Sequence, residues 1–125
     1  MNVVDSSGWL EYFAGGANAP FFSGAIENIS GLIVPSLSLY EVFKRIVQQR
    51  TENDALKAIA AMQQGRVVDL DGRIALCAAR ISLDHHLPLA DSIMLATTNS
   101  YAAMFWTQDS HYEKMDGVKY KKAQQ

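Results

Sequence analysis

Four carboxylates in this sequence are placed where they could bind a metal ion: Asp5, Glu41, Asp91 and Asp109. Each follows the end of a predicted strand or lies in the first turn of a predicted helix. Functional groups of open α/β sheets collect at the carboxyl ends of the strands, so we expect these acids to converge. Crowded carboxylates favour a divalent cation, and oxygen ligands select Mg²⁺ or Mn²⁺ over zinc. Such a site can polarise a phosphodiester and activate water for in-line attack.

Each acid also has an ordinary structural role open to it. Asp5 and Asp109 can cap the helices that follow them, and Glu41 can complete a capping box with Ser38. Asp91 can interact favourably with a helix dipole. However, its helix is apolar on most sides, and a buried charge is costly unless it is paired or bound to metal. We expect no basic partner for it from residues 87–112.

Hydrophobic patterning predicts the elements that must position these acids. Short apolar runs predict strands, and apolar residues at i, i+3, i+4 and i+7 predict amphipathic helices. The predicted strands are residues 3–4, 31–35, 66–70, 103–107 and 117–120. The predicted helices are residues 7–14, 18–29, 36–47, 52–64, 71–86, 88–98 and a short helix near 110–115. This order predicts one α/β domain over residues 1–125, with a central mostly parallel sheet of four to five strands flanked by helices.

Other residues with reactive side chains are assigned to the core or the surface. Cys77 falls in the apolar stripe of the helix at 71–86, so we expect a small core residue. His85 and His86 would point about 100° apart on a helix, which makes them a poor metal pair. Five of the 12 aromatic residues lie between Trp9 and Phe22. Some of these must be core, and the segment could also be an interface for a partner.

Composition restricts the classes of function. The chain has 125 residues, 49% of them hydrophobic, and a formal net charge of -2. This charge excludes a globally basic nucleic-acid binder, so a polyanion would need a local basic patch or a metal ion. A single cysteine permits no internal disulfide. We find no candidate membrane span or signal peptide, and we therefore expect a cytoplasmic protein with no membrane partner.

Four segments together resemble the motifs of a known family, the PIN-domain ribonucleases of the VapC type, which are the toxins of VapB–VapC toxin–antitoxin pairs. The segments are VDSSGWLEYF with Asp5, SLYEVFKR with Glu41, LPLADSIMLATT with Asp91, and FWTQDSHYEKMDGVKY with Thr107 and Asp109. The resemblance covers essentially the whole chain, as a PIN-like nuclease domain over residues 1–125.

The resemblance also implies roles for individual residues. The four acids would be the catalytic metal ligands, with Asp109 often acting through water, and Ser7 and Thr107 would support them. The family commonly has a proline before the glycine of its last loop, whereas this chain has Asp116 there. That departure leaves open whether Asp116 adds a fifth acid to the rim of the site.

The function implied by the resemblance is a Mg²⁺- or Mn²⁺-dependent endoribonuclease that inhibits growth by cutting RNA. The resemblance further implies a homodimer and a cognate antitoxin that wraps the helices and can insert a basic side chain among the acids. Family members cut different RNAs, and the motifs do not indicate which RNA this chain would cut.

Two alternatives belong to other classes of function. The first is a catalytically inactive PIN-like module that binds protein or RNA. The second is a phosphoacceptor signalling domain, which needs an acidic pair after its first strand, where Asp5 stands alone. It also needs a lysine on the last strand opposite a phosphorylatable Asp69, and only Lys119 is available for that position.

Overall fold

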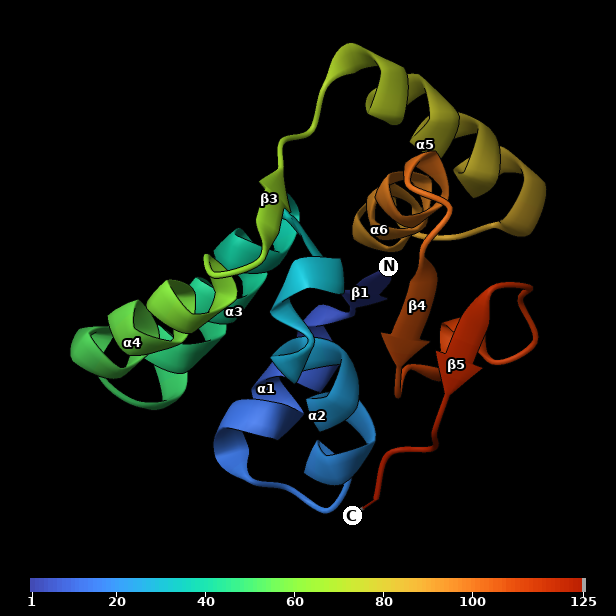
Figure 1. The fold of residues 1–125 in the computed structure, drawn as a ribbon. Helices are drawn as coiled ribbons and strands as arrows, with labels where there is room; N and C mark the ends of the chain where they lie inside the picture. Colours follow the sequence, from blue (N-terminus) through green and yellow to red (C-terminus); the bar gives the residue numbers. More distant parts are fainter. Residues whose placement is uncertain (125) are drawn as a thin grey trace.

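Five short strands form one sheet in the computed structural model, which describes residues 1–124 (Figure 1). The strands are β1 (Asn2–Val4), β2 (Leu32–Pro35), β3 (Arg66–Val68), β4 (Met104–Thr107) and β5 (Val118–Tyr120). They lie in the order β3-β2-β1-β4-β5, and every neighbouring pair is parallel. The expected α/β fold with a mostly parallel sheet is therefore confirmed, and the sheet is in fact wholly parallel.

Helices cover both faces of this sheet. The α-helices are α1 (Ser6–Ala14), α2 (Ala19–Glu27), α3 (Ser36–Gln49), α4 (Glu52–Met62), α5 (Gly72–His85) and α6 (Leu89–Ser100). Two 3-10 turns are η1 (Ile29–Gly31) and η2 (Ser110–Tyr112). One face packs against α1 to α4, and the other packs against α6, with α5 outermost on α6 (Figure 1).

Alternation along the central strand divides the core between the two faces. Val3 packs with the α6 side, and Val4 packs with the side formed by α1 to α4. Both valines are fully buried. A parallel sheet covered on both faces buries both sets of side chains, which explains why this strand shows no polar alternation in the sequence. Trp9 and Phe22 are also core residues.

Gly8 allows the first two helices to pack closely. A Cβ atom on this residue would lie 2.6 Å from Cε1 of Phe22 and 2.8 Å from Cγ1 of Val4. A larger residue would therefore push α1 away from both α2 and β1. Gly15 then ends α1 with φ of 64°, a conformation that glycine adopts at little cost.

Two local predictions are wrong. Helix α3 begins at Ser36 without a side-chain cap, since Ser38 lies inside the helix, where its hydroxyl contacts Sδ of Met94. The second concerns Cys77, which is exposed. Helix α5 packs mainly on α6, so its buried stripe is narrow and contains Ile74 and Ala78. Cys77 lies about 60° around the axis from Ile74, outside this stripe.

No helix within residues 1–124 is both long and apolar enough to cross a membrane.

Candidate functional site

The four acids lie at one edge of the sheet because of how their elements run. Asp5 directly follows β1, and Asp109 comes two residues after β4. Helix α3, which carries Glu41, begins where β2 ends. Helix α6 leads into the amino end of β4, so its own amino end, with Asp91, lies at the carboxyl edge of the sheet. This edge is where parallel α/β sheets place their functional groups.

Asp5 is the most buried of the four acids, with 8% of its surface exposed. Its Oδ1 accepts a hydrogen bond from the backbone N–H of Ser6 at 2.8 Å, so it also caps α1. Its Oδ2 accepts from the hydroxyls of Ser7 at 3.1 Å and Thr107 at 2.9 Å. Burial raises the pKa of this carboxyl to about 6, against the three hydrogen bonds, and the charge of Asp109 adds to the rise. A buried acid of this kind is a common feature of functional sites.

Thr107 connects Asp5 to Asp109. While its hydroxyl donates to Asp5, it accepts a hydrogen bond from the backbone N–H of Asp109 at 2.9 Å. The side chain of Thr107 is fully buried at the end of β4. The position of Asp109 is therefore tied to that of Asp5 across the β1–β4 pair.

Glu41 reaches the same edge through Ser6. The Ser6 hydroxyl donates to Oε1 of Glu41 at 2.7 Å, and the Ser6 backbone N–H donates to Asp5. One residue of α1 thus holds two acids from different parts of the chain. The capping box with Ser38 is absent, so Glu41 is free for this contact.

Asp91, Asp109 and His111 form the tightest group of potential metal ligands. One atom from each side chain lies within 4.8 Å of the other two. His111 Nδ1 is 3.1 Å from Oδ2 of Asp91 and 3.5 Å from Oδ1 of Asp109. The hydrogen bond to Asp91, then the charges of Asp109 and Asp91, raise the pKa of His111. The expectation that residues 87–112 offer no basic partner is wrong, because η2 turns His111 back toward α6.

Tyr112 forms the buried floor beside these acids. Its side chain is fully buried against the ring of Phe105, with ring centroids 4.8 Å apart. Its hydroxyl has no hydrogen-bond partner among the described residues. Burial raises the pKa of Tyr112, and the negative charges of Asp5, Asp91 and Asp109 raise it further. The acids therefore share a common environment with an unsatisfied polar group.

Asp116 is not brought to this edge. It precedes β5, whose carboxyl end lies with the site, so Asp116 belongs to the opposite edge. There it lines a hollow with His85 and Lys114. Asp69 follows β3, which β2 separates from β1, so it does not lie beside Asp5 as a phosphoacceptor arrangement would require.

The donor set at this edge suits a divalent cation. The site contains carboxylates from four different elements, and within residues 1–124 none of them forms an ion pair with lysine or arginine. Carboxylate oxygens suit hard cations such as Mg²⁺ and Mn²⁺, while the single imidazole adds a nitrogen donor. The residues present therefore fit a metal ion, and they could support hydrolysis of a phosphate ester.

Three participants were missed by sequence reasoning: Ser6, His111 and Tyr112. The place of Ser6 directly after Asp5 was a signal for its role. His111 lies two residues after Asp109, which was also a signal. The buried hydroxyl of Tyr112 had none, because its depth depends on how η2 packs on Phe105.

The model of the PIN domain family matches residues 3–118. No curated protein matches the sequence significantly. A chain of a toxin–antitoxin complex from Klebsiella pneumoniae superposes with a TM-score of 0.80 at 18% identity, covering 95% of this chain and 96% of that one.

Two further structures share the fold. DNA-bound VapBC from Salmonella typhimurium has a TM-score of 0.75 at 13% identity, with 98% of this chain and 97% of that one covered. A sarcin–ricin loop-cleaving VapC toxin from Mycobacterium tuberculosis has a TM-score of 0.70 at 15% identity, with 83% and 85% covered.

Proposed function

The chain belongs to the PIN-domain family, and from this premise we propose that it is a divalent-metal-dependent endoribonuclease, the toxin of a toxin–antitoxin pair. The observation that carries the proposal is the convergence of acids from β1, α3, α6 and the end of β4 at one edge of the sheet. Structural relatives described as toxin–antitoxin complexes, and one described as cleaving the sarcin–ricin loop, support this choice.

The residues divide the work between binding the metal and holding its ligands. Asp5, Asp91 and Asp109 would hold the Mg²⁺ or Mn²⁺ ion, with Glu41 beside them. When bound, the ion supplies Lewis-acid polarisation of the phosphodiester and lowers the pKa of a water nucleophile. Thr107 keeps Asp5 and Asp109 in register through its two hydrogen bonds. Preorganised ligands of this kind need little rearrangement during the reaction.

A basic and aromatic strip next to the acids offers a path for the RNA backbone. The backbone N–H of Lys121 donates to the carbonyl of Thr107 at 3.1 Å, so Lys121 lies directly beside the site. Its Nζ is 6.0 Å from the centroid of the Phe21 ring, and Lys119 Nζ is 5.0 Å from that of Trp106. Lysines interleaved with aromatic rings are typical of surfaces that bind single-stranded nucleic acid. Because the protein has a net negative charge, binding of RNA needs a local basic patch or a metal ion, and this strip would be such a patch.

Cleavage assays with charge-neutral variants test the proposal. Asp5→Asn and Asp91→Asn should each abolish cleavage of a generic RNA in Mg²⁺ or Mn²⁺, while circular dichroism shows an intact fold. Asp116→Asn is the matched control and should cleave like wild type, because it removes an acid from the opposite edge. Wild-type rates in both site variants would refute the site. RNA binding without cleavage by the wild type would favour the inactive module instead.

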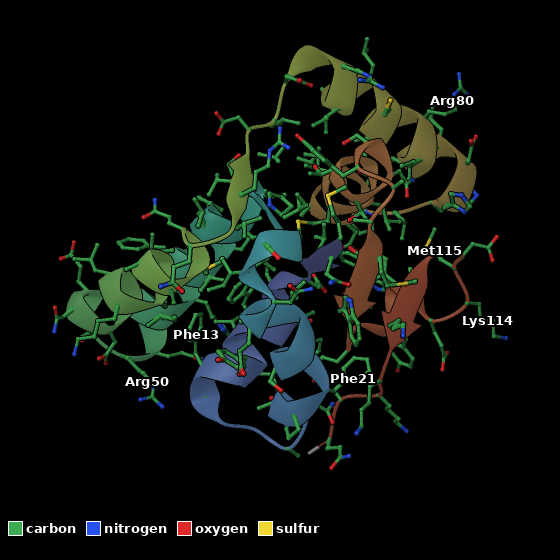
Figure 2. The ribbon with its side chains drawn as sticks, viewed as in Figure 1. Phe13, Phe21, Arg50, Arg80, Lys114 and Met115 are labelled. Carbon is green, nitrogen blue, oxygen red and sulfur yellow. The ribbon has the colours of Figure 1, made fainter. Side chains whose placement is uncertain are left out.

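A groove between three helices would receive the antitoxin. Leu10, Phe13 and Ala14 of α1 face residues of α3 and α4 across a hollow of about 270 Å³. Phe13 and Arg50, which are labelled in Figure 2, both line this groove. Its lining is mostly apolar and carries two basic residues, Arg50 and Lys57, with one acid, Asp54, which suits an apolar segment that carries acidic residues. Of the aromatic residues between Trp9 and Phe22, Phe13 lines this groove, so under the proposal the segment would serve the interface as well as the core.

The outer face of α5 would form the homodimer. Leu76 is 76% exposed and Leu83 is 67% exposed, and the two lie seven residues apart on this helix. Leu89, at the start of α6, is 76% exposed as well. Exposed leucines at helical spacing mark a protein interface, and a second copy of the chain would bury them.

A further inference from the structure

We propose that His111 is itself a metal ligand, through Nδ1, and that this nitrogen makes the site prefer Mn²⁺ over Mg²⁺. The inference rests on the proposed function and deepens it. It starts from the position of the His111 imidazole. The proposed set of metal ligands contains only carboxylates, and the family match gives no role to this histidine.

The ligand atoms are spaced as one metal ion requires. Neighbouring ligands of an octahedral ion with bonds of about 2.1 Å lie about 3.0 Å apart. His111 Nδ1 lies 3.1 Å from Oδ2 of Asp91 and 3.5 Å from Oδ1 of Asp109. The atoms of all three side chains lie within 4.8 Å of one another, so movements of these side chains would bring them onto one ion.

The backbone already holds His111 in place for this role. Its N–H donates to Oδ1 of Asp109 at 2.9 Å, which caps the η2 turn. Asp109 is in turn fixed by Thr107 at the end of β4. The imidazole is 57% exposed at the rim, whereas the Asp91 side chain is only 20% exposed beneath it. His111 thus stands between the acids and the solvent from which an ion would arrive.

The choice of metal follows from the chemistry of the donors. Mg²⁺ keeps to oxygen ligands and demands near-ideal octahedral geometry. Mn²⁺ is also well served by carboxylates, but as a first-row transition metal it accepts an imidazole nitrogen more readily than Mg²⁺ does. One nitrogen among several carboxylates therefore favours Mn²⁺ over Mg²⁺. For Mg²⁺, the same imidazole is a competitor, because it occupies Oδ2 of Asp91 through their 3.1 Å contact.

Binding and spectroscopy on the full chain at about pH 8, where most imidazoles are neutral, test this role. Electron spin echo spectroscopy of bound Mn²⁺ should show coupling to a ¹⁴N nucleus in the wild type and none in His111→Gln. Titration calorimetry should show that His111→Gln weakens Mn²⁺ binding about tenfold or more. Its Mg²⁺ affinity should be unchanged or higher. His85→Gln, a histidine from the opposite edge, should match wild type in every measurement.

The outcomes separate this inference from the proposed function. Bound Mn²⁺ without nitrogen coupling in the wild type, or coupling that persists in His111→Gln, would overturn the role of His111 alone. Equal weakening of Mn²⁺ and Mg²⁺ binding would overturn the preference. If the wild type binds neither ion and Asp5→Asn cleaves RNA as well as wild type does, the proposed function fails as well.

Discussion

The hydroxyl of Thr107 donates a 2.9 Å hydrogen bond to Oδ2 of Asp5, although the two residues lie 102 positions apart in the chain. The same hydroxyl accepts a 2.9 Å bond from the N–H of Asp109. A single side chain at the end of β4 therefore sets the relative positions of two acids. Because Asp5 and Thr107 are buried, the link should affect stability as well as activity.

Thr107→Val should destabilise the metal-free protein at neutral pH. The variant keeps the shape of threonine but leaves Oδ2 of Asp5 with only the Ser7 hydroxyl and the N–H of Asp109 without a partner, which should cost about 1–3 kcal/mol of the free energy of unfolding. Urea unfolding followed by circular dichroism measures this. Thr107→Ser should recover most of the loss. Thr97→Val is the control, because the Thr97 hydroxyl bonds only to Ile93 within its own helix. Equal losses at positions 97 and 107 would argue against the link.

Asp5 should make the stability of the metal-free protein depend on pH. Its pKa is about 6 in the folded chain against an ordinary value of 3.8, so the folded state binds this proton more tightly than the unfolded state. The resulting stabilisation is fully present below the lower pKa and is lost as pH rises toward the higher one. Over this window, about 3 kcal/mol of unfolding free energy should disappear.

The variant Asp5→Asn removes this titration. Its unfolding free energy should change less with pH between the two pKa values. At neutral pH it should be higher than that of wild type. Urea unfolding of metal-free protein at a series of pH values measures both effects. Parallel pH profiles for the two proteins would show that Asp5 titrates normally.

Asp91→Asn should lower the stability of the metal-free protein, whereas Asp5→Asn should raise it. Asp91 has His111 beside it and lies at the amino end of α6. Its charge is favourable there by about 0.3–1 kcal/mol from the helix dipole alone. We therefore expect the melting temperature to fall in Asp91→Asn and to rise in Asp5→Asn when a chelator is present. A rise in both would mean that repulsion among the acids outweighs the contribution of His111.

Divalent metal should stabilise the wild type. A ligand that binds only the folded state adds about 2.7 kcal/mol when its concentration is 100 times its dissociation constant. Thermal melts in excess Mn²⁺ should therefore show a clear upward shift for wild type and a smaller one for Asp91→Asn. The same melts in Ca²⁺ provide a comparison, because Ca²⁺ forms longer bonds to its oxygen ligands than Mg²⁺ does. Identical shifts in the two proteins would place the ion elsewhere.

Lys121→Gln should weaken RNA binding without removing metal binding. The side chain carries no metal ligand, but it lies beside Thr107 at the proposed path of the RNA backbone. The variant should raise KM more than it lowers kcat. The slope of the logarithm of the binding constant against the logarithm of the salt concentration should become less steep by the value of about one phosphate contact. Lys114→Gln is the control, because Lys114 (Figure 2) precedes the amino end of β5, whereas Lys121 follows its carboxyl end. Equal effects from both lysines would indicate nonspecific attraction.

Leu83→Lys should convert the proposed homodimer to a monomer. The variant places a charge within the exposed face of α5, where a second copy would have to bury it. Light scattering after size-exclusion chromatography measures the mass of each species. Leu56→Lys provides the control, since Leu56 is 54% exposed on α4. A wild type that is monomeric at high concentration would contradict the dimer.

Much of the fold could be predicted from the sequence because it depends on local patterns. Val3 and Val4 are apolar in succession, as expected for a strand buried on both faces. The helices predicted over residues 36–47 and 71–86 also appear in the structure as α3 and α5, and Asp71 caps the second of them. These features involve residues within a few positions of one another, so the sequence alone contains their cause.

The positions of Asp5, Glu41, Asp91 and Asp109 were also predicted at one edge, because a parallel sheet brings together the residues that follow its strands. The contacts among them were not. Ser6 bridges Asp5 to Glu41, and η2 returns a histidine to α6.

Only the tertiary structure decided these contacts and the exposure of particular side chains. Asp116 and Asp109 both lie in the closing segment, yet the parallel direction of β5 places them at opposite edges of the sheet. Cys77 fits an apolar stripe, yet it is exposed because α5 packs mainly on α6. Periodicity records which side of an element is apolar. It does not record how much of that side another element will cover, or which distant residue will meet it, since both depend on strand order and helix direction.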